Sequence, residues 1–137
     1  MQQVDVNFVA VLLCGVASMV IGFLWYSKML FGATWMKLSG ISEADMKKAN
    51  SNMPVMYGTM FVASLVMAYV LAHFAKYAGA ATLMDGVVAG FWAWLGFVAT
   101  TMLSGSLFES KPIKLYFINT GYQLVTLVVM GAILVSM

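Results

Sequence analysis

The sequence predicts an all-α fold, a bundle of four transmembrane helices that forms a single domain over residues 1–137. The composition and the spacing of the charges are the observations that predict it. Of the 137 residues, 63% are hydrophobic and 9% are charged, whereas an average soluble domain has about 25% charged residues. Four stretches contain no Asp, Glu, Lys or Arg, and each exceeds the roughly 20 residues with which a helix crosses a bilayer. These stretches are residues 6–27, 49–75, 86–108 and 115–137.

Four membrane spans follow from these stretches and from the residues beside them. We expect the spans at about residues 7–26, 54–74, 84–108 and 113–135. The first span leaves the membrane through Trp25 and Tyr26, aromatic residues of the kind that gather at bilayer surfaces. Pro54 and Pro112 stand where the second and fourth spans begin, and proline suits the first turn of a helix.

The long connection at residues 28–52 is predicted to be a cytoplasmic loop with a short amphipathic helix. Hydrophobic and lysine residues mix between residues 29 and 38, as in segments that lie on a membrane surface. Gly40 interrupts this segment, and Ser42 with Asp45 has the character of a capping box that starts a helix at about residues 43–50. The residues expected to anchor the protein at this surface are Trp25, Tyr26, Lys28, Phe31, Trp35 and Lys111.

The uneven distribution of the lysines predicts the orientation of the chain. Six of the seven lysines lie in the loops after the first and third spans, and Lys76 lies on the opposite side. Short lysine-bearing loops stay in the cytoplasm. Both termini are therefore expected outside the cytoplasm.

Small residues recur at helical spacing in the first and third spans. Cys14, Ser18 and Gly22 follow one another at intervals of four, and Gly86 and Gly90 have the same spacing. Residues four apart share one face of a helix, and small ones let two helix backbones approach closely. We interpret both faces as helix-packing surfaces.

Polar residues form one face of the fourth span at the depth of the bilayer. This candidate intramembrane polar site consists of Asn119, Tyr122, Gln123 and Thr126, with Thr100 and Trp94 from the third span. Uncharged polar groups are costly in lipid unless they are paired, so these side chains are expected to point into the bundle. Two interpretations remain open: hydrogen bonds that hold the helices together, or a solvated or ligand-contacting site.

A short internal similarity links the ends of the first and third spans. Residues 22–28, Gly-Phe-Leu-Trp-Tyr-Ser-Lys, match residues 105–111, Gly-Ser-Leu-Phe-Glu-Ser-Lys, at four identical positions. Both segments end a span on the same side of the membrane. One hypothesis is therefore a pair of tandem helical hairpins related by an axis along the membrane normal, as in some transporters.

The reactive residues of the sequence favour a protein without catalytic activity. Catalysis requires converging ionisable or nucleophilic groups, but Cys14 lies in mid-span and His73, the single histidine, near an outer end. No metal-ligand cluster or phosphate-binding loop is recognisable, so we expect no cofactor and no metal. The seven lysines, without any arginine, also argue against nucleic-acid binding.

Several motifs resemble a known family. They are Gly22-Phe-Leu-Trp-Tyr-Ser, Leu30-Phe-Gly, Trp35-Met, Trp94-Leu-Gly-Phe, Ile118-Asn and Gly121-Tyr. Together they are similar to the domain-of-unknown-function family number 1761, small and mostly bacterial membrane proteins. The resemblance implies a four-helix integral membrane protein of the bacterial inner (plasma) membrane. It implies no activity.

Three hypotheses for the function follow from these observations. The first is a non-enzymatic bundle that associates with itself, as a homo-oligomer, or with a larger membrane partner. The second is a small oligomeric transporter or channel that uses the polar face of the fourth span. The third is the binding of a lipid or another hydrophobic ligand through the aromatic cytoplasmic loop. Membrane lipids are the expected surroundings in all three, and no small-molecule ligand can be named.

Overall fold

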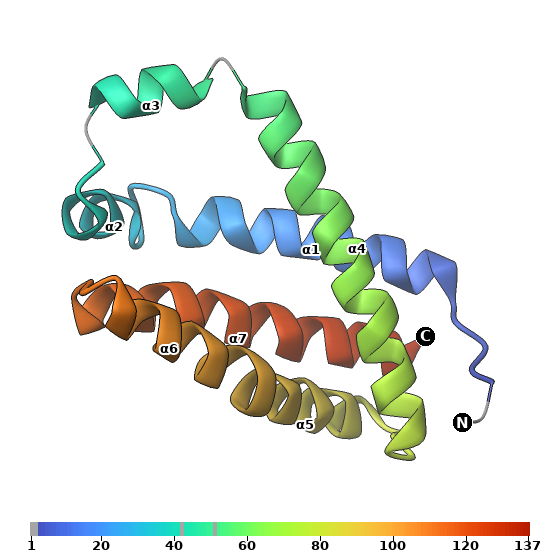
Figure 1. The fold of residues 1–137 in the computed structure, drawn as a ribbon. Coiled ribbons are helices and arrows are strands. Elements are labelled where there is room, and N and C mark those ends of the chain that lie inside the picture. The colour runs from blue at the N-terminus through green and yellow to red at the C-terminus, as the bar shows by residue number, and fades with distance from the viewer. Residues whose placement is uncertain (1–2, 42, 51) are drawn as a thin grey trace.

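The computed structural model describes residues 3–41, 43–50 and 52–137, and the regular structure of this part is helical (Figure 1). The π-helix η1 lies between α5 and α6 and continues the same rod. The elements are α1 (Phe8–Trp25), α2 (Gly32–Ser39), α3 (Glu43–Asn50), α4 (Met53–Tyr77), α5 (Leu83–Ala93), η1 (Trp94–Ala99), α6 (Thr100–Phe108) and α7 (Ile113–Ser136).

Four of these helical segments are long and apolar enough to cross a membrane, which confirms the predicted all-α, four-span fold. They are Phe8–Trp25, Met53–Tyr77, Leu83–Phe108 and Ile113–Ser136. Their outer faces carry many exposed large hydrophobic side chains. In a bilayer these faces contact lipid, because the chain has few charges with which to cover them. The protein is therefore a multi-pass membrane protein.

Local signals determine where the helices begin and end. The Asn7 side chain accepts hydrogen bonds from the backbone N–H groups of Val9 and Ala10 at the start of α1. Thr82 and Asp85 form a reciprocal capping box at the start of α5. Gly40, with a φ of 72°, lies directly after α2. The long connection thus contains two short helices, and the capping box expected at Ser42 lies outside the described residues.

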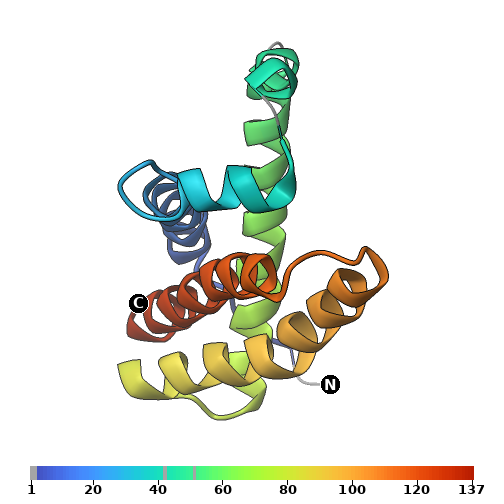
Figure 2. The ribbon, with the colours of Figure 1, turned by 90° about the vertical axis from the view of Figure 1, so that its left-hand side faces the viewer.

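The spans alternate in direction, so the six lysines of the long connection and of the α6–α7 turn gather at one end of the molecule. We call this the lysine-rich end; its members are Lys28, Lys37, Lys47, Lys48, Lys111 and Lys114. Both termini lie at the opposite end (Figure 1). Figure 2 looks at the bundle from the lysine-rich end, and α7 lies between α1 and the span formed by α5 and α6.

The tightest helix contact joins α5 to α7, where glycines bring the two backbones together. A Cβ atom added to Gly86 would collide with the carbonyl oxygen of Gly131, and one added to Gly90 with that of Leu127. Both glycines are buried. The small face predicted for the third span therefore packs directly on the fourth, as small residues allow in membranes.

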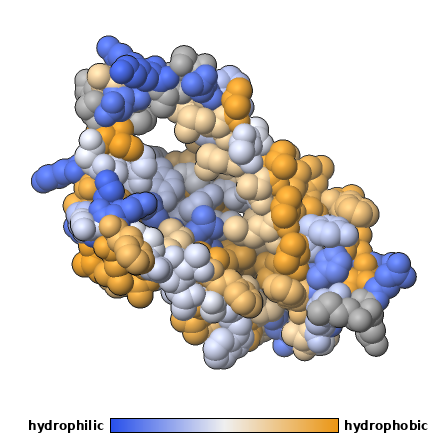
Figure 3. Space-filling view, in the orientation of Figure 1, coloured by the Kyte–Doolittle hydropathy of each residue, from blue (hydrophilic) through white to orange (hydrophobic). Residues whose placement is uncertain are grey.

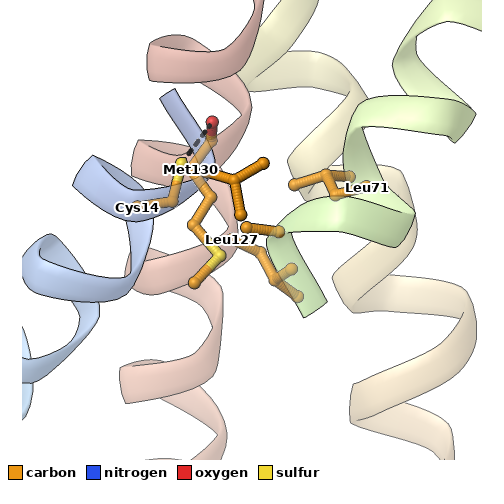
Figure 4. Packing of buried hydrophobic residues seen from close by; sticks show 6 residues of the cluster. Cys14, Leu71, Leu127 and Met130 are labelled. Carbon is orange, nitrogen blue, oxygen red and sulfur yellow. Dashed lines mark hydrogen bonds between the residues drawn. The ribbon is translucent and has the colours of Figure 1, made fainter. Parts of the chain in front are cut away.

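The small face of α1 packs against the other side of α7. Cys14 is completely buried, and its Sγ donates a hydrogen bond to the carbonyl oxygen of Met130 at 3.6 Å (Figure 4). A Cβ atom on Gly22 would lie 3.2 Å from the hydroxyl oxygen of Tyr122. Around this contact lies the hydrophobic core, whose buried members are Val11, Cys14, Ala68, Leu71, Leu127 and Met130.

The hairpin of α1 and α4 packs more loosely than the hairpin of α5, α6 and α7. α4 crosses α1 steeply and diverges from it toward the lysine-rich end, whereas α5 and α6 follow α7 (Figure 1). Gly22 and Gly105, the first residues of the two similar segments, also differ in their surroundings. Gly22 lies against the Tyr122 ring, but a Cβ atom on Gly105 would meet no other residue within 4 Å. The tandem repeat stays a prediction, supported by the sequence similarity alone.

Candidate functional site

A tight turn after α1 creates the most distinctive site of the molecule. The backbone N–H of Gly32 donates to the carbonyl oxygen of Ser27 at 2.9 Å, and that of Phe31 donates to the carbonyl of Trp25 at 3.1 Å. A Cβ atom on Gly32 would collide with the carbonyl oxygen of Tyr26 and lie 2.8 Å from that of Ser27. Only glycine fits this position, and the turn places α2 across the end of α1.

The aromatic residues of this turn point toward the protein. The indole Nε1 of Trp25 donates to the carbonyl oxygen of Ile118 on α7 at 2.9 Å, and the Phe31 ring lies 4.8 Å from the Trp25 ring. Trp35 meets the Tyr26 ring edge-on at 5.7 Å. The four aromatic residues predicted as surface anchors therefore pack against one another, and Trp25 fastens the turn to α7. The other two predicted anchors, Lys28 and Lys111, are exposed.

Two of these aromatic residues, Tyr26 and Trp35, line a cavity of about 520 Å³ between α1, α2, α4 and α7. Pockets for small molecules typically have volumes of about 300–1,000 Å³ and apolar or aromatic walls. Figure 3 shows this region as a hollow with pale residues inside and strongly hydrophilic residues over α3 at its edge. We call it the interfacial cavity. It is lined by Met19, Gly22, Phe23, Tyr26, Lys28, Gly32, Ala33, Trp35, Met36, Tyr57, Met60 and Tyr122.

The interfacial cavity continues onto the outer surface of the helices. Phe23 of α1 and Met60 of α4 line it, yet 57% of the Phe23 surface and 46% of the Met60 surface are exposed. The Phe23 ring also contacts the ring of Tyr57 at 5.3 Å between centroids, which links α1 to α4 beside the opening. A molecule in the surrounding bilayer could reach the cavity sideways through this region.

The three tyrosine hydroxyls and the Lys28 ammonium of the cavity wall differ in their partners. The Tyr26 hydroxyl donates to Asn119 at 2.7 Å, and the Tyr122 hydroxyl donates to the carbonyl oxygen of Ser18 at 3.1 Å. Within the described ranges, the Tyr57 hydroxyl has no hydrogen-bond partner and the Lys28 ammonium has no ion-pair partner. The Tyr57 hydroxyl and the Lys28 ammonium are therefore available to a ligand.

Two residues of the predicted polar face hold helices together and also border cavities. Tyr122 contacts Ser18 through its hydroxyl, and the Ser18 hydroxyl in turn lies 3.0 Å from that of Ser64, which connects α7, α1 and α4. Asn119 accepts from Tyr26 and also borders a cavity of about 170 Å³ beside α6. These hydrogen bonds fit the first interpretation, and a solvated or ligand-contacting site stays a prediction.

The other four predicted members of the polar face do not join a common site. Trp94 donates from Nε1 to the carbonyl oxygen of Thr120 at 2.8 Å, which is a packing contact between η1 and α7. Thr100 is exposed on the outer surface, and its hydroxyl donates to the carbonyl of Gly96 in its own helix. In the described part of the chain, the buried Thr126 hydroxyl has no partner, and Gln123 is half-buried.

Sequence reasoning missed the far wall of the interfacial cavity. Tyr57 and Met60 belong to α4 and come after the long connection, so no spacing along the chain associates them with Gly22 or Tyr26. Gly32, the glycine of the tight turn, was the one feature of the sequence that could have pointed to this site. Within the described ranges, no three His, Cys, Asp or Glu side chains come close enough together to hold a metal ion.

The match with a family model decides the relationship of this chain to known proteins. The model, described as a protein of unknown function (DUF1761), matches residues 9–135. The chain belongs to this family. Neither the curated proteins nor the solved structures include a match to the chain. The segment Gly22–Trp35 of this DUF1761 member forms the turn and one wall of the interfacial cavity.

Proposed function

We propose that this protein is a non-enzymatic membrane protein that binds the apolar part of an amphipathic molecule in the interfacial cavity. The observation that carries the proposal is the cavity itself, with a volume of about 520 Å³ and walls built largely from aromatic and methionine side chains. Methionine adapts to ligands of varied shape, and aromatic rings offer large rigid contact surfaces. Such walls suit a hydrocarbon chain better than a polar metabolite.

The side opening supports the bilayer as the source of the ligand. Phe23 and Met60 are exposed where the transmembrane helices face lipid, and both also line the cavity. A lipid tail that moves from the bilayer into the cavity exchanges one apolar environment for another. It then gains close packing against Tyr57 and Trp35, since dispersion contacts add up over many atoms.

The proposal places the interfacial cavity at the cytoplasmic face of the plasma membrane of a bacterium. The support is the gathering of six lysines at the lysine-rich end, because lysine-bearing loops are retained in the cytoplasm. Both termini then lie outside the cytoplasm. The ligand would come from the inner leaflet.

Native mass spectrometry of the detergent-purified protein tests the proposal. Ala33 lies on the cavity wall, so Ala33→Trp fills the cavity, whereas Ala63→Trp adds the same bulk to an exposed position of α4 outside it. We expect the wild type and Ala63→Trp to retain one tightly bound lipid and Ala33→Trp to lose it. Equal retention by the two variants would falsify cavity binding.

Self-association is a second candidate function, supported by glycines that face open space within the described part of the protomer. A Cβ atom added to Gly96 or Gly105 would meet no other residue within 4 Å. Small residues on a lipid-facing surface permit close contact with another helix. If a second copy docks there, Gly96→Leu together with Gly105→Leu lowers the oligomer fraction in lipid nanodiscs. The variant Gly58→Leu, at an equally open position of α4, is the control and leaves the fraction unchanged.

A further inference from the structure

We infer that the ligand of the interfacial cavity is an anionic phospholipid whose phosphate is bound by Lys28. This inference rests on the proposed function and adds the chemical class of the ligand. Lys28 lines the cavity and follows directly on the turn residues Tyr26 and Ser27. Lys28 is exposed, and it is the one residue with a charged side chain among those that line this largely apolar cavity.

The position of Lys28 relative to the membrane fits a phosphate headgroup. α1 ends at Trp25, so Lys28 is three residues beyond the apolar helix, where the headgroups of a bilayer begin. Phe23 belongs to the apolar helix α1, which ends before Lys28, and Met60 belongs to the span α4, so this part of the cavity wall lies within the transmembrane segments. One molecule can thus place a hydrocarbon chain on these side chains and a phosphate on the ammonium group. Lysine binds phosphate as a point charge.

The charge of the lysine-rich end, to which Lys28 belongs, also favours an anion. The segments that meet at the lysine-rich end, residues 28–52 and 109–114, contain six lysines and three acidic residues in the sequence. Lys28 has no ion-pair partner among the residues that the structure describes, so an incoming phosphate displaces no carboxylate. Basic side chains near a membrane surface attract anionic lipids by about 1 kcal/mol each, which corresponds to a preference of about fivefold.

The open side of the cavity admits a two-chain phospholipid. A closed cavity would require the whole ligand to fit within about 520 Å³. Here the exposed surfaces of Phe23 and Met60 leave one side in contact with the bilayer. One acyl chain can occupy the cavity while the other stays among the lipids, so the second chain imposes no steric penalty.

Competition between lipids of equal chain length tests the inference. The purified protein is titrated with dioleoyl phosphatidylglycerol, dioleoyl phosphatidylcholine or oleate, and retained ligand is counted by native mass spectrometry. We expect the wild type to prefer the phosphatidylglycerol about fivefold over the phosphatidylcholine. Lys28→Gln reduces this preference to about onefold, and Lys28→Arg preserves it. Lys37→Gln, which removes an exposed lysine of α2 outside the cavity wall, leaves most of it intact.

The outcomes separate this inference from the proposed function. Equal retention of the two phospholipids, with loss of both in Ala33→Trp, overturns the anionic preference and leaves the cavity as a lipid site. Stronger retention of oleate than of phosphatidylglycerol overturns the choice of a phospholipid. If Ala33→Trp retains lipid like the wild type, the proposed function itself fails. An equal loss in Lys28→Gln and Lys37→Gln also overturns the inference, because it indicates a general effect of surface charge.

Discussion

The hydroxyl of Tyr26 donates a hydrogen bond of 2.7 Å to Oδ1 of Asn119, 93 positions further along the chain. This bond ties the turn after α1 to α7. The Tyr26 ring also meets the rings of Trp35 and Tyr122 edge-on. One side chain therefore connects α1, α2 and α7 and forms part of the wall of the interfacial cavity.

Tyr26→Phe removes this hydrogen bond and keeps the aromatic ring. We expect the free energy of unfolding to fall by about 1 kcal/mol, the usual net value of a hydrogen bond in proteins and in membranes. Unfolding in mixed micelles with increasing SDS measures it. Tyr57→Phe is the matched control, because its hydroxyl has no partner within the described ranges, and its effect should be near zero. A double-mutant cycle with Asn119→Ala that gives no coupling energy would contradict the role of the bond.

Glycine is required at position 90, where α5 contacts α7, but not at position 105 in α6. Gly90→Ala forces a methyl group against the carbonyl oxygen of Leu127, and overpacking of this kind costs about 1–3 kcal/mol. Gly105→Ala meets open space and raises helix propensity, so it stabilises the protein by about 0.5–1 kcal/mol. SDS unfolding of both variants checks the opposite signs. A stable Gly90→Ala protein would disprove the backbone contact.

The sequence alone predicted the spans because burial in lipid leaves a one-dimensional signal. Charge-free stretches must be long enough to cross the bilayer, and the four observed spans differ from the expected ones by at most three residues at either end. Helix packing was also visible in part. Gly86 and Gly90 share a face, so their close approach to a neighbour could be expected, although spacing does not name the neighbour as α7.

The interfacial cavity could not be predicted, because it depends on how two helices diverge. α4 leaves α1 at a steep angle, and nothing in the residue pattern of either helix specifies that angle. The inward direction of Trp25 was equally hidden. A tryptophan at the end of a span suits the membrane surface, but here its Nε1 hydrogen-bonds to Ile118. Thr100 shows the opposite case, a residue expected to point inward that faces outward. Its hydroxyl donates a hydrogen bond to the carbonyl oxygen of Gly96 in the same rod.

Gly32→Ala tests whether the turn shapes the cavity. The added methyl group collides with the carbonyl oxygens of Tyr26 and Ser27, so the turn must open and α2 must move away from the end of α1. We expect loss of the retained lipid and a destabilisation of about 1–3 kcal/mol. Gly58→Ala, at an open position of α4, should retain the lipid and be at least as stable as the wild type. Lipid retention in Gly32→Ala equal to that of the control would show that the turn does not shape the site.

Labelling of single cysteines tests the orientation of the lysine-rich end. The one natural cysteine, Cys14, is completely buried in α1, so the wild type should not react with a membrane-impermeant maleimide in any folded preparation. In a Cys14→Ala background, Ala44→Cys places a thiol on exposed α3 and Ala78→Cys places one at the opposite end, after α4.

Because lysine-bearing loops are retained in the cytoplasm, right-side-out membrane vesicles should label Ala78→Cys, and inverted vesicles should label Ala44→Cys. The reversed pattern would put the interfacial cavity in the outer leaflet. A phospholipid of the cytoplasmic leaflet could then not be its ligand, although the geometry of Lys28 and Phe23 around the cavity would be unchanged.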